Sequence, residues 1–458
     1  MPARRTGRPD GENDLEKFGP VRVGLLGIGT IGRGTFEVLG RNREEITRRG
    51  GRSIVITKVA DVDVERARAI VGEHAQVCGD GAEIVSDPDI DIVVELIGGY
   101  TIAKDLVLAA IANGKHVVTA NKAMLAVHGN RIFAEASKQG VMVAFEAAVA
   151  GGVPIIKAIR EGLAANRIER VAGIINGTTN FVLSEMRDKE LAFADALAEA
   201  QALGFAEADP TFDVEGVDAA HKITLLASLA FGVPIQFDKC HVEGISSLRN
   251  IDVRYADELG YRIKLLGIAI RREAQPGSPD GIELRVHPTL VPERRLLANV
   301  EGAMNAVWVR GDAVGDTIYY GQGAGAEPTA SAVIADLVDV ARMLTVDPGN
   351  RVPHLAFQPE ALVDIPIMPI DEARSASYLR IPVADQPGVL ARITGHLADA
   401  GISIDAALQK PSEDEPRTDV ILLTDVSEDR RIVAAIEAIE AMPTVLGAVV
   451  RIRREELD

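Results

Sequence analysis

Three features that would mark a secreted, membrane-spanning or nucleic-acid-binding protein are missing from the sequence. The only cysteines are Cys78 and Cys240, with neither a CxxC pair nor a metal-binding spacing, so a disulfide framework is excluded and a reducing cytoplasm is expected. No charge-free apolar run reaches the ~18 residues of a membrane helix, and no apolar segment near the N-terminus forms a signal peptide. Basic residues are scarce, since 49 Lys and Arg stand against 67 Asp and Glu. The net charge of -18 makes nucleic acid and anionic membranes poor partners.

What is present is the composition of an ordinary globular protein. Apolar residues make up 47% of the chain and charged residues 25%, which excludes widespread disorder. At about 150 residues per domain, 458 residues suggest about three domains. Residues 1–20 are basic, then acidic, and we expect them to form a disordered tail.

A glycine-rich loop follows the first apolar run. The segment VRVGLLGIG is typical of a buried strand, and TIGRGTFEVLGRNREEI continues with the apolar spacing of a helix. Between them lies the GxGxxG pattern that holds a dinucleotide pyrophosphate at a helix N-terminus. Gly27 allows the turn, Gly29 lets the phosphates approach the backbone, and Gly32 lets the helix pack on the strand. We therefore expect NAD or NADP to bind here, with Thr30 and Ile31 also in contact.

The second strand, SIVITKVAD, ends in Asp61, where this fold places the group that meets the adenosine ribose. A carboxylate there accepts a hydrogen bond from the 2′-hydroxyl and repels a 2′-phosphate, which favours NAD over NADP. Arg66 and Arg68 follow closely and could instead reach a phosphate. Another possibility is that Asp61 only caps the next helix.

Strand-like and helix-like segments then alternate through DIVVELIGG, TIAKDLVLAAIANG, KHVVTA and VMVAFEA. The alternation predicts a parallel sheet, and hence an α/β fold with a Rossmann-type dinucleotide-binding domain over residues 21–150. Ligands of such sheets bind at the carboxyl ends of the strands. The residues expected at that edge include Gly98, Lys122 and Glu146.

Residues 151–315 lose this alternation, which predicts an α+β domain, and they contain two polar clusters. The first is INGTTN, in which Asn176, Gly177 and Thr178 offer hydrogen-bonding groups to a small polar substrate. The same spacing also suits a simple turn with a helix N-cap.

The second cluster lies in GFAEADPTFDVEGVDAAHKITLLASLAFG. Its apolar spacing predicts a largely buried helix from Val217 to Phe231. Asp218 and Lys222 are four residues apart and therefore share one face of that helix. Charges on so apolar a helix are costly to bury unless they are paired or take part in chemistry. An exposed helical ion pair is the alternative.

These motifs resemble those of homoserine dehydrogenase in the form that carries a C-terminal ACT regulatory domain. The resemblance runs from about Val21 to the C-terminus and rests on GLLGIGTIG, VVTANKAMLA, AAVAGGVPII, INGTTNFVL, GFAEADPTFDVEGVDAAHK and GAGAEPTASAV. It implies reversible NAD(P)-dependent interconversion of L-homoserine and L-aspartate 4-semialdehyde in threonine, methionine and isoleucine biosynthesis. It also implies a homodimer or homotetramer, with residues 151–315 serving catalysis and dimerisation. No fused aspartate kinase is expected, because only a short tail precedes Val21.

The resemblance assigns Lys222 as the catalytic lysine and Lys122 as a second active-site lysine that also lies by the cofactor. An ammonium within reach of the aldehyde can donate a proton to its oxygen as that oxygen gains negative charge. A second ammonium nearby would lower the pKa of the first and ease the donation. Glu207 matches the residue that receives the substrate α-ammonium, and Asp218 matches the carboxylate near the substrate and Lys222.

The resemblance also implies a site for Na⁺ or K⁺. The segment FEAAVAGGV supplies the matching positions Glu146, Val149, Gly151 and Val153, of which only Glu146 would use its side chain. A glycine turn that enters a helix is the alternative. Residues 316–350 match a segment that returns to pack on the dinucleotide domain, with Gly325 as a cofactor contact.

Residues 351–374 are a proline-rich linker, and residues 375–458 have the strand–helix–strand–strand–helix–strand order of a ferredoxin-like domain. This order resembles an ACT domain. The resemblance implies that an effector amino acid, threonine being expected as the end product, is bordered by Asp385, Gly388, Val389 and Leu390. The turn at Gly388 onto a helix N-terminus is a natural carboxylate site. The alternative is a domain that only dimerises.

Two other functions remain open. A different semialdehyde dehydrogenase, such as aspartate semialdehyde dehydrogenase, needs a cysteine nucleophile, and neither Cys78 nor Cys240 has its motif setting. A non-catalytic amino-acid or redox sensor would also combine a dinucleotide fold with an ACT domain. Such a sensor has no reason to keep Lys222, Glu207 and Asp218 together.

Overall fold

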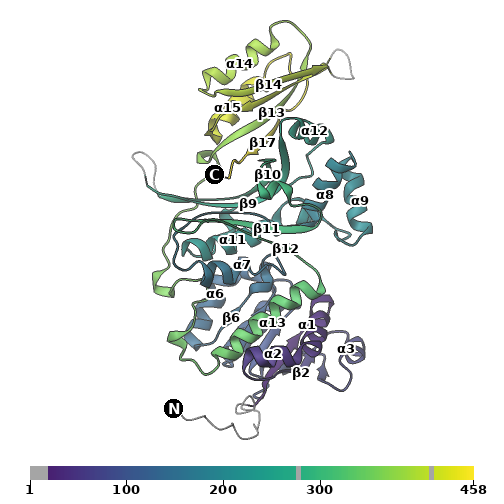
Figure 1. The fold of residues 1–458 in the computed structure, drawn as a ribbon, viewed down its shortest axis with the longest axis vertical. Coiled ribbons are helices and arrows are strands. Elements are labelled where there is room, and N and C mark those ends of the chain that lie inside the picture. The colour runs from purple at the N-terminus through teal and green to yellow at the C-terminus, as the bar shows by residue number, and fades with distance from the viewer. Residues whose placement is uncertain (1–18, 275–279, 412–416, 458) are drawn as a thin grey trace, which may run out of the picture. The chain divides into compact units, whose positions relative to one another are not determined.

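The computed structural model describes residues 19–274, 280–411 and 417–457, so the expected N-terminal tail falls almost wholly outside the described residues. The chain divides into two compact units, Met1–Lys157 with Ala324–Glu360, and Ala158–Gly323 with Ala361–Asp458. Each unit contains one main sheet, and the two are described in turn (Figure 1).

The first unit is built on a six-stranded parallel sheet in the order β3-β2-β1-β4-β5-β6. The order reverses between β1 and β4, which is where such sheets bind ligands. Strands β1, β4, β5 and β6 are almost wholly buried because helices cover both faces, so their apolar runs are continuous rather than alternating, whereas β3 at the edge is not buried. Their bounds are β1 (Val21–Leu26), β2 (Ile54–Ala60), β3 (Gln76–Cys78), β4 (Ile92–Glu95), β5 (His116–Thr119) and β6 (Val143–Ala144).

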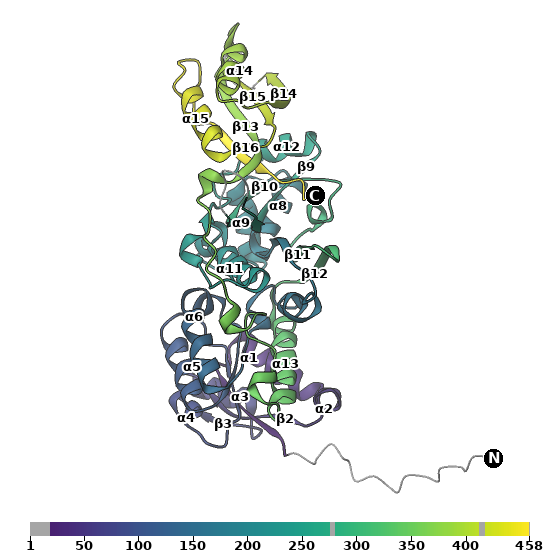
Figure 2. The same cartoon turned by 90° about the vertical axis from the view of Figure 1, so that its left-hand side faces the viewer.

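The helices of this unit lie on opposite faces of the sheet, with α1 and α13 on one and α5 and α6 on the other (Figure 2). The segment predicted to form one helix after the glycine loop forms two, because the chain bends at Asn42. The helix bounds are α1 (Thr30–Arg41), α2 (Arg43–Gly50), α3 (Val64–Val71), α4 (Ala82–Val85), α5 (Ile102–Ala112), α6 (Lys122–Gln139), α7 (Ile155–Lys157) and α13 (Ala326–Met343).

Helix α13 joins this unit from far along the chain and packs closely on α1. A Cβ atom on Gly34 would lie 2.8 Å from the carbonyl oxygen of Ala326, so the small residue permits the contact. Buried side chains of α13, among them Val333 and Leu337, complete the core that contains β1, β2 and β4.

The second unit has a mainly antiparallel sheet whose path is β12-β11-β7-β9-β10-β17-β13-β15-β14. Its first five strands are β7 (Ile168–Ile174), β9 (Tyr261–Arg272), β10 (Gly281–Pro292), β11 (Met304–Gly311) and β12 (Gly315–Gln322). Helix α11 packs against β7, β9 and β10. The helices here are α8 (Gly177–Asp188), α9 (Phe193–Ala202), α10 (Thr211–Val214), α11 (Val217–Phe231) and α12 (Asn250–Glu258). The predicted helix from Val217 to Phe231 is confirmed at both ends.

The C-terminal part of this unit has the βαββαβ order predicted from the sequence. Its strands β17, β13, β15 and β14 are adjacent in that order, as in a ferredoxin-like fold, and α14 and α15 close its own apolar core. Strand β17 also pairs with β10, so one sheet runs through the whole unit. The bounds are β13 (Arg374–Ala384), α14 (Val389–Asp399), β14 (Ile404–Pro411), β15 (Arg417–Thr424), α15 (Asp429–Glu440) and β17 (Val450–Arg454). The predicted fold class is confirmed.

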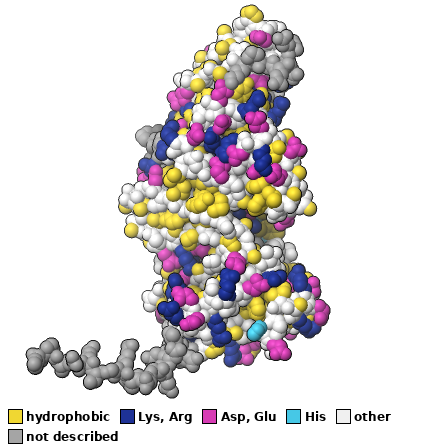
Figure 3. Space-filling model, turned by 45° about the vertical axis from the view of Figure 1, so that its right-hand side comes forward, with side chains coloured by type: hydrophobic (Ala, Val, Ile, Leu, Met, Phe, Trp, Pro, Cys, Tyr) yellow, Lys and Arg dark blue, Asp and Glu magenta, His cyan; other side chains and the backbone are white. Residues whose placement is uncertain are grey.

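Acidic and basic side chains intermix over the face shown in Figure 3, so the negative net charge is not gathered in one patch there. Within the described ranges, none of the helices is both long enough and apolar enough to span a bilayer.

Candidate functional site

The glycine loop has the backbone geometry that its sequence predicts. Gly27 has φ 89°, and a Cβ atom there would lie 2.9 Å from the carbonyl oxygen of Leu96. A Cβ atom on Gly32 would lie only 2.2 Å from the carbonyl oxygen of Gly27. Gly29 differs, since a Cβ atom there would meet nothing within 4 Å. Two glycines are therefore required by the fold, whereas Gly29 leaves open space above the loop.

Helix α1 begins directly after this open position. Gly29 is its N-cap residue, and no side chain caps the helix. The N–H groups of the first turn, at Thr30 and Ile31, are therefore available to an anion, and the helix dipole favours negative charge there. This arrangement fits the pyrophosphate of a dinucleotide.

Asp61 holds the glycine loop from the neighbouring strand. Its carboxylate accepts hydrogen bonds from the N–H groups of Ile28 (2.8 Å) and Asp63 (2.9 Å), and Arg66 lies 3.3 Å away. Burial disfavours the ionised form, but these three partners outweigh it and keep the pKa of Asp61 below its ordinary value. The idea that Asp61 only caps the next helix is wrong, because Asp63 caps α3.

A buried acid that sequence reasoning did not single out ties together the loops after β4 and β5. Glu95 is fully buried and accepts hydrogen bonds from the hydroxyl of Thr119 (2.6 Å) and from the N–H groups of Ile97 and Gly98. Asn121 donates to the carbonyl of Gly99 at 2.9 Å. The sequence feature that could have identified Glu95 is a carboxylate inside the otherwise apolar run DIVVELIGG.

The same network fixes the start of α6. Asn121 caps the helix by accepting from the N–H of Met124 at 3.0 Å, and Lys122 is the first helical residue. The side chain of Lys122 is half-buried. Lys122, Gly98 and Asp61 thus all follow the carboxyl ends of parallel strands, as does the glycine loop itself.

Gly325 stands at the N-terminus of α13 with φ 119°, a conformation that favours glycine. No side chain caps α13. It lies in the same unit as the glycine loop, whose helix α1 packs on α13.

The segment after β6 places Glu146 in a buried turn. Its two carboxylate oxygens accept hydrogen bonds from the N–H groups of Ile156 (2.9 Å) and Lys157 (2.8 Å) at the start of α7. Ala150 and Gly151 both have positive φ, at 54° and 46°, so the chain reverses sharply between them. A carboxylate oxygen has a second lone pair, and backbone carbonyls lie in the turn, so this chemistry is compatible with a hard monovalent cation.

In the second unit, Asp218 and Lys222 form a buried ion pair. Lys222 Nζ lies 2.6 Å from Asp218 Oδ2 and also donates to the carbonyl of Ile175 at 2.7 Å. Their side chains are 12% and 5% exposed, so the alternative of an exposed helical pair is wrong. Asn176 Nδ2 donates to the same Asp218 oxygen at 2.8 Å.

Asn176 also joins a second carboxylate to this cluster. Its amide nitrogen donates to Asp213 Oδ1 at 2.7 Å, and the hydroxyl of Thr178 lies 3.1 Å from Asp213 Oδ2. Burial and the nearby Asp218 raise the pKa of Asp213. Sequence reasoning missed Asp213, because the motif holds several acids and their spacing does not say which one faces Asn176.

The INGTTN loop is both a helix start and part of this cluster. Asn176 Oδ1 accepts from the N–H of Thr179 at 2.8 Å and so caps α8. A Cβ atom on Gly177 would lie 2.7 Å from the carbonyl oxygen of Ala303, which explains the glycine. INGTTN therefore does form a turn with a helix N-cap, as the alternative interpretation predicts. The amide of Asn176 in addition donates hydrogen bonds to Asp213 and Asp218.

Glu207 is placed differently from these residues. It lies on the exposed loop between α9 and α10, and its side chain makes no hydrogen bond with any residue that the structure describes. Residues Asn176, Thr178, Asp213, Asp218 and Lys222 are brought together, whereas Glu207 stands apart from their hydrogen-bond network.

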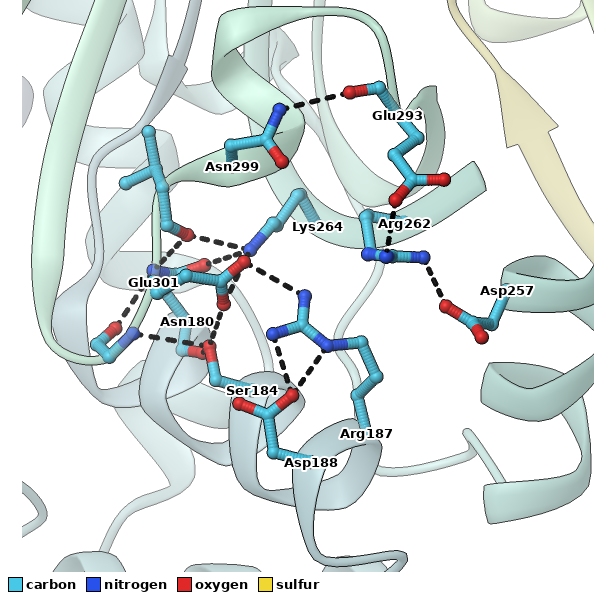
Figure 4. Close-up of polar contacts among 12 residues, drawn as sticks. Asn180, Ser184, Arg187, Asp188, Asp257, Arg262, Lys264, Glu293, Asn299 and Glu301 are labelled. Atoms are coloured by element: carbon cyan, nitrogen blue, oxygen red, sulfur yellow. Dashed lines mark hydrogen bonds and ion pairs between the residues drawn. The ribbon is translucent and has the colours of Figure 1, made fainter. Parts of the chain in front are cut away.

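A second polar network connects α8 with β9 and with the turn at residues 300–302 (Figure 4). Lys264 is 1% exposed, donates to the carbonyl of Val300 at 2.6 Å and lies 3.7 Å from Glu301. Asn180 donates to the carbonyls of Val300 and Gly302. The network therefore holds the turn that contacts Gly177. Burial lowers the pKa of Lys264 to about 8.

The C-terminal loop that follows β13 also begins a helix without a side-chain cap. Gly388 has φ 87° and is the N-cap residue of α14. Asp385 and Leu390 are exposed, whereas Val389 is buried in the core of this part. Open N–H groups at a helix start suit a carboxylate.

Neither cysteine is poised as a nucleophile. Burial raises the pKa of the Cys240 thiol to about 12, and burial together with Glu83 raises the pKa of Cys78. Thiols with raised pKa values are poor attacking groups, which argues against a thioester mechanism. Within the described residues, no cluster of three or more His, Cys, Asp or Glu side chains could hold a metal ion.

Comparison with known proteins agrees with this geometry. The family profile described as homoserine dehydrogenase, NAD binding domain, matches residues 27–146, that of homoserine dehydrogenase matches 154–338, and that of the ACT domain matches 377–441. A homoserine dehydrogenase of Pseudomonas aeruginosa is 61% identical over 441 residues, which cover 96% of this chain and 100% of that protein.

Solved structures give the same result. The crystal structure of a homoserine dehydrogenase from Thiobacillus denitrificans has a TM-score of 0.91 and 62% identity, covering 96% of this chain and 99% of the other. A hyperthermophilic archaeal homoserine dehydrogenase in complex with NADPH has a TM-score of 0.59 and 25% identity, covering 70% of this chain and 97% of the other. The chain belongs to the homoserine dehydrogenase family of NAD(P)-dependent oxidoreductases.

Proposed function

We propose that the buried Lys222–Asp218 pair carries the proton transfer in the NAD(P)-dependent interconversion of L-homoserine and L-aspartate 4-semialdehyde. The observation that supports this most is the ammonium of Lys222, held 2.6 Å from Asp218 and oriented by the carbonyl of Ile175. The nicotinamide cofactor, when bound, supplies or accepts the hydride. The protein must then orient the substrate and move one proton.

In the direction of reduction, the aldehyde oxygen gains negative charge as its carbon receives the hydride. Lys222 donates a proton to that oxygen and becomes a neutral amine, while Asp218 stabilises the ammonium beforehand. In the direction of oxidation the amine takes the hydroxyl proton back. Lys122 is proposed as the second lysine of the active site, near the cofactor.

The substrate is a zwitterion, and its α-ammonium calls for a carboxylate. Glu207 remains the proposed partner, and its exposed loop position is suited to an approaching ligand. Asp213 is a further candidate, because it belongs to the buried cluster with Asn176 and Thr178. Asn176, Gly177 and Thr178 are proposed to line the rest of the substrate pocket.

The dinucleotide is proposed to lie along Gly27, Gly29, Thr30, Ile31 and Gly32. Further contacts are proposed at Gly98, Lys122 and Gly325. NAD is proposed as the preferred cofactor, because the ionised Asp61 beside the glycine loop would repel a 2′-phosphate. The NADPH in the archaeal relative is the counter-argument, together with Arg66, which is half exposed and could turn to a phosphate.

Glu146, with the backbone carbonyls of Val149, Gly151 and Val153, is proposed to hold Na⁺ or K⁺. The ion would fix the turn between β6 and α7, and it takes no part in proton transfer. Replacing Na⁺ and K⁺ by a large organic cation should lower the stability of the enzyme, and unchanged stability would count against the site.

Threonine is proposed as the effector, bound by the loop with Asp385, Gly388, Val389 and Leu390. The open start of α14 supports a carboxylate ligand there. A homodimer or homotetramer is proposed, since effector loops of this domain type usually face one another in pairs. A cytoplasmic location is proposed from the two free cysteines.

One assay tests the reaction, the cofactor preference and the effector together. Oxidation of L-homoserine is followed with NAD and NADP side by side, with and without millimolar L-threonine. We expect turnover with both cofactors, a higher kcat/KM with NAD, and inhibition by threonine. A chain that binds the dinucleotide but turns over no homoserine would be a sensor, and the enzyme proposal would fail.

A further inference from the structure

One face of strand β10 is unusually polar for a buried strand. Glu283, Arg285 and His287 alternate along it, and all three are at most 3% exposed. Alternate residues of a strand point to the same side, so the three side chains form one row. Cross-strand pairing extends the row sideways, because Ile270 of β9 lies opposite both Glu283 and Arg170 of β7.

The charges in this row do not balance. Arg285 lies between two carboxylates, 2.9 Å from Glu283 and 2.8 Å from Glu455. Arg272 of β9 lies 2.7 Å from Glu283. Arg170 is the third guanidinium, and it has no hydrogen bond or ion pair with any residue that the structure describes. Three permanent cations therefore face two carboxylates.

Burial and the neighbouring Arg272 and Arg285 lower the pKa of Arg170 despite the attraction of Glu455. A guanidinium held near like charges without a hydrogen-bonded anion is destabilising, because it loses part of its hydration. Such a surplus is unexpected in a chain whose net charge is -18.

Two cavities are lined in part by Arg170, which carries this surplus charge. The first, about 340 Å³, is lined by Arg170 and Arg272, by three further arginines, Arg167, Arg271 and Arg310, and by Glu169 and Glu273. Glu169 pairs with Arg310 and Glu273 with Arg167, so neither carboxylate is paired with Arg170. The second, about 490 Å³, shares Arg170 and Arg272 and adds Arg374, Arg454 and two glutamates. Both volumes suit a small molecule rather than a single water.

Two arginines that line the cavities have one nitrogen without an acceptor. The Nε atoms of Arg271 and Arg454 are buried and have no hydrogen-bond partner within the described part of the chain, while their terminal nitrogens pair with Asp280 and Asp405. In the second cavity, Glu455 is already bonded to Arg285 and Glu456 to Arg294 at 2.6 Å, so its own carboxylates do not neutralise Arg170.

We propose that these two neighbouring cavities bind a small anion through its carboxylate or phosphate groups, with Arg170 as the main partner. Guanidinium groups bind both kinds of oxyanion through paired N–H donors, so the chemistry of the site is shared by the two. Arg170 is the guanidinium that lacks an anion, so one oxyanion group is enough to balance the row. The neighbouring arginines of the cavities already have carboxylate partners, namely Arg167, Arg271, Arg272, Arg310 and Arg454.

The site is separate from the glycine loop and from the loop at Gly388. It is lined by β7 and β9 and also by β13 and the segment after β17. The bound anion would therefore connect the sheet that supports Lys222 with the C-terminal βαββαβ part. This gives the enzyme a second ligand site besides the one proposed for threonine, and it does not depend on that proposal.

The test is isothermal titration of the full-length enzyme with citrate in one arm and inorganic phosphate in the other. NAD is kept saturating so that the glycine loop is occupied, and ionic strength and sodium concentration are held constant. Wild-type protein is expected to bind citrate. In Arg170→Gln the Kd should rise by at least about 10-fold, the loss expected for one charge-assisted hydrogen-bonded pair. Tighter binding of phosphate than of citrate would identify a phosphate ligand as the natural class.

Arg131→Gln is the matched control, since Arg131 is exposed on α6 and the substitution changes the charge equally. It should bind citrate as wild type does. Without ligand, Arg170→Gln should be at least as stable as wild type, because a cation lacking a partner has been removed. Absence of binding to wild type, or equal binding to Arg170→Gln, would overturn the proposal. A change of oligomeric state in Arg170→Gln would assign the cavities to a contact between copies and would also overturn it.

Discussion

Replacing Gly32 by alanine places a methyl carbon 2.2 Å from the carbonyl oxygen of Gly27, well inside van der Waals contact. The oxygen belongs to the backbone of the glycine loop, so it cannot rotate away as a side chain would. Either α1 moves off the sheet or the loop deforms. Overpacking of this kind costs roughly 1–3 kcal/mol.

Gly29→Ala is the paired substitution. Its methyl carbon would meet nothing within 4 Å in the protein, and Gly29 has an ordinary φ of -64°. Loss of a glycine at the helix N-cap changes stability by no more than about 1 kcal/mol. The methyl group would, however, occupy the space proposed for the pyrophosphate.

Gly32→Ala should therefore mainly lower stability, whereas Gly29→Ala should mainly weaken cofactor binding. At about 2–4 °C per kcal/mol, Gly32→Ala should lower the Tm of the ligand-free protein by roughly 2–12 °C. Gly29→Ala should change the Tm by no more than about 4 °C and weaken NADH binding by at least about 10-fold, or 1.4 kcal/mol. Calorimetry measures the first quantity and titration of NADH fluorescence the second.

Two results would refute this reasoning. If Gly32→Ala were as stable as wild type, the close contact would not limit the loop. If Gly29→Ala bound NADH normally, the open space above Gly29 would not hold the cofactor.

Three further variants probe other parts of the molecule. Arg380 and Asp252 form a buried ion pair 2.6 Å apart, and their side chains are 2% and 0% exposed. Arg380→Met leaves Asp252 without this partner and should lower the free energy of unfolding, measured with denaturant, by about 3–5 kcal/mol. A decrease below ~1 kcal/mol would contradict this. Asp213→Asn should raise the KM for homoserine by roughly 10-fold or more, the value of a hydrogen bond to a charged group, with Tm unchanged; an unaltered KM would remove Asp213 from the site. Lys264 has a folded pKa of about 8, below the unfolded value of about 10.4. The unfolded chain therefore binds more protons between pH 8 and 10.4, so the unfolding free energy should rise with pH in that window by a few kcal/mol relative to Lys264→Met. Parallel pH profiles of the two proteins would argue against a buried ammonium.

Periodicity carried most of the fold prediction. The buried helix from Val217 to Phe231 was predicted at both ends, because its apolar spacing is regular and glycines at 216 and 232 bound it. The parallel sheet followed from alternating segments. The break at Asn42 was not predicted, since the apolar spacing continues through it.

The site was predicted in part. Lys222 and Asp218 were found because charges at helical spacing stand out on an apolar helix. Asp213 was missed, because its partner Asn176 lies 37 residues earlier and only the folded chain brings them together. Arg170 was not predicted for the same reason. The charges around it include Glu455, which lies far along the chain and comes close only in the folded protein.

The most direct test of the account is the turnover of Lys222→Gln with homoserine and NAD. The glutamine amide can still donate to Asp218 but cannot release a proton at working pH. We expect kcat to fall by at least about 100-fold, the lower range for loss of a general acid–base group, while NADH binding and Tm stay near wild type. Lys239→Gln, at an exposed lysine of the same unit, should retain full activity. Near-normal turnover by Lys222→Gln would contradict the assignment of Lys222 as the proton donor.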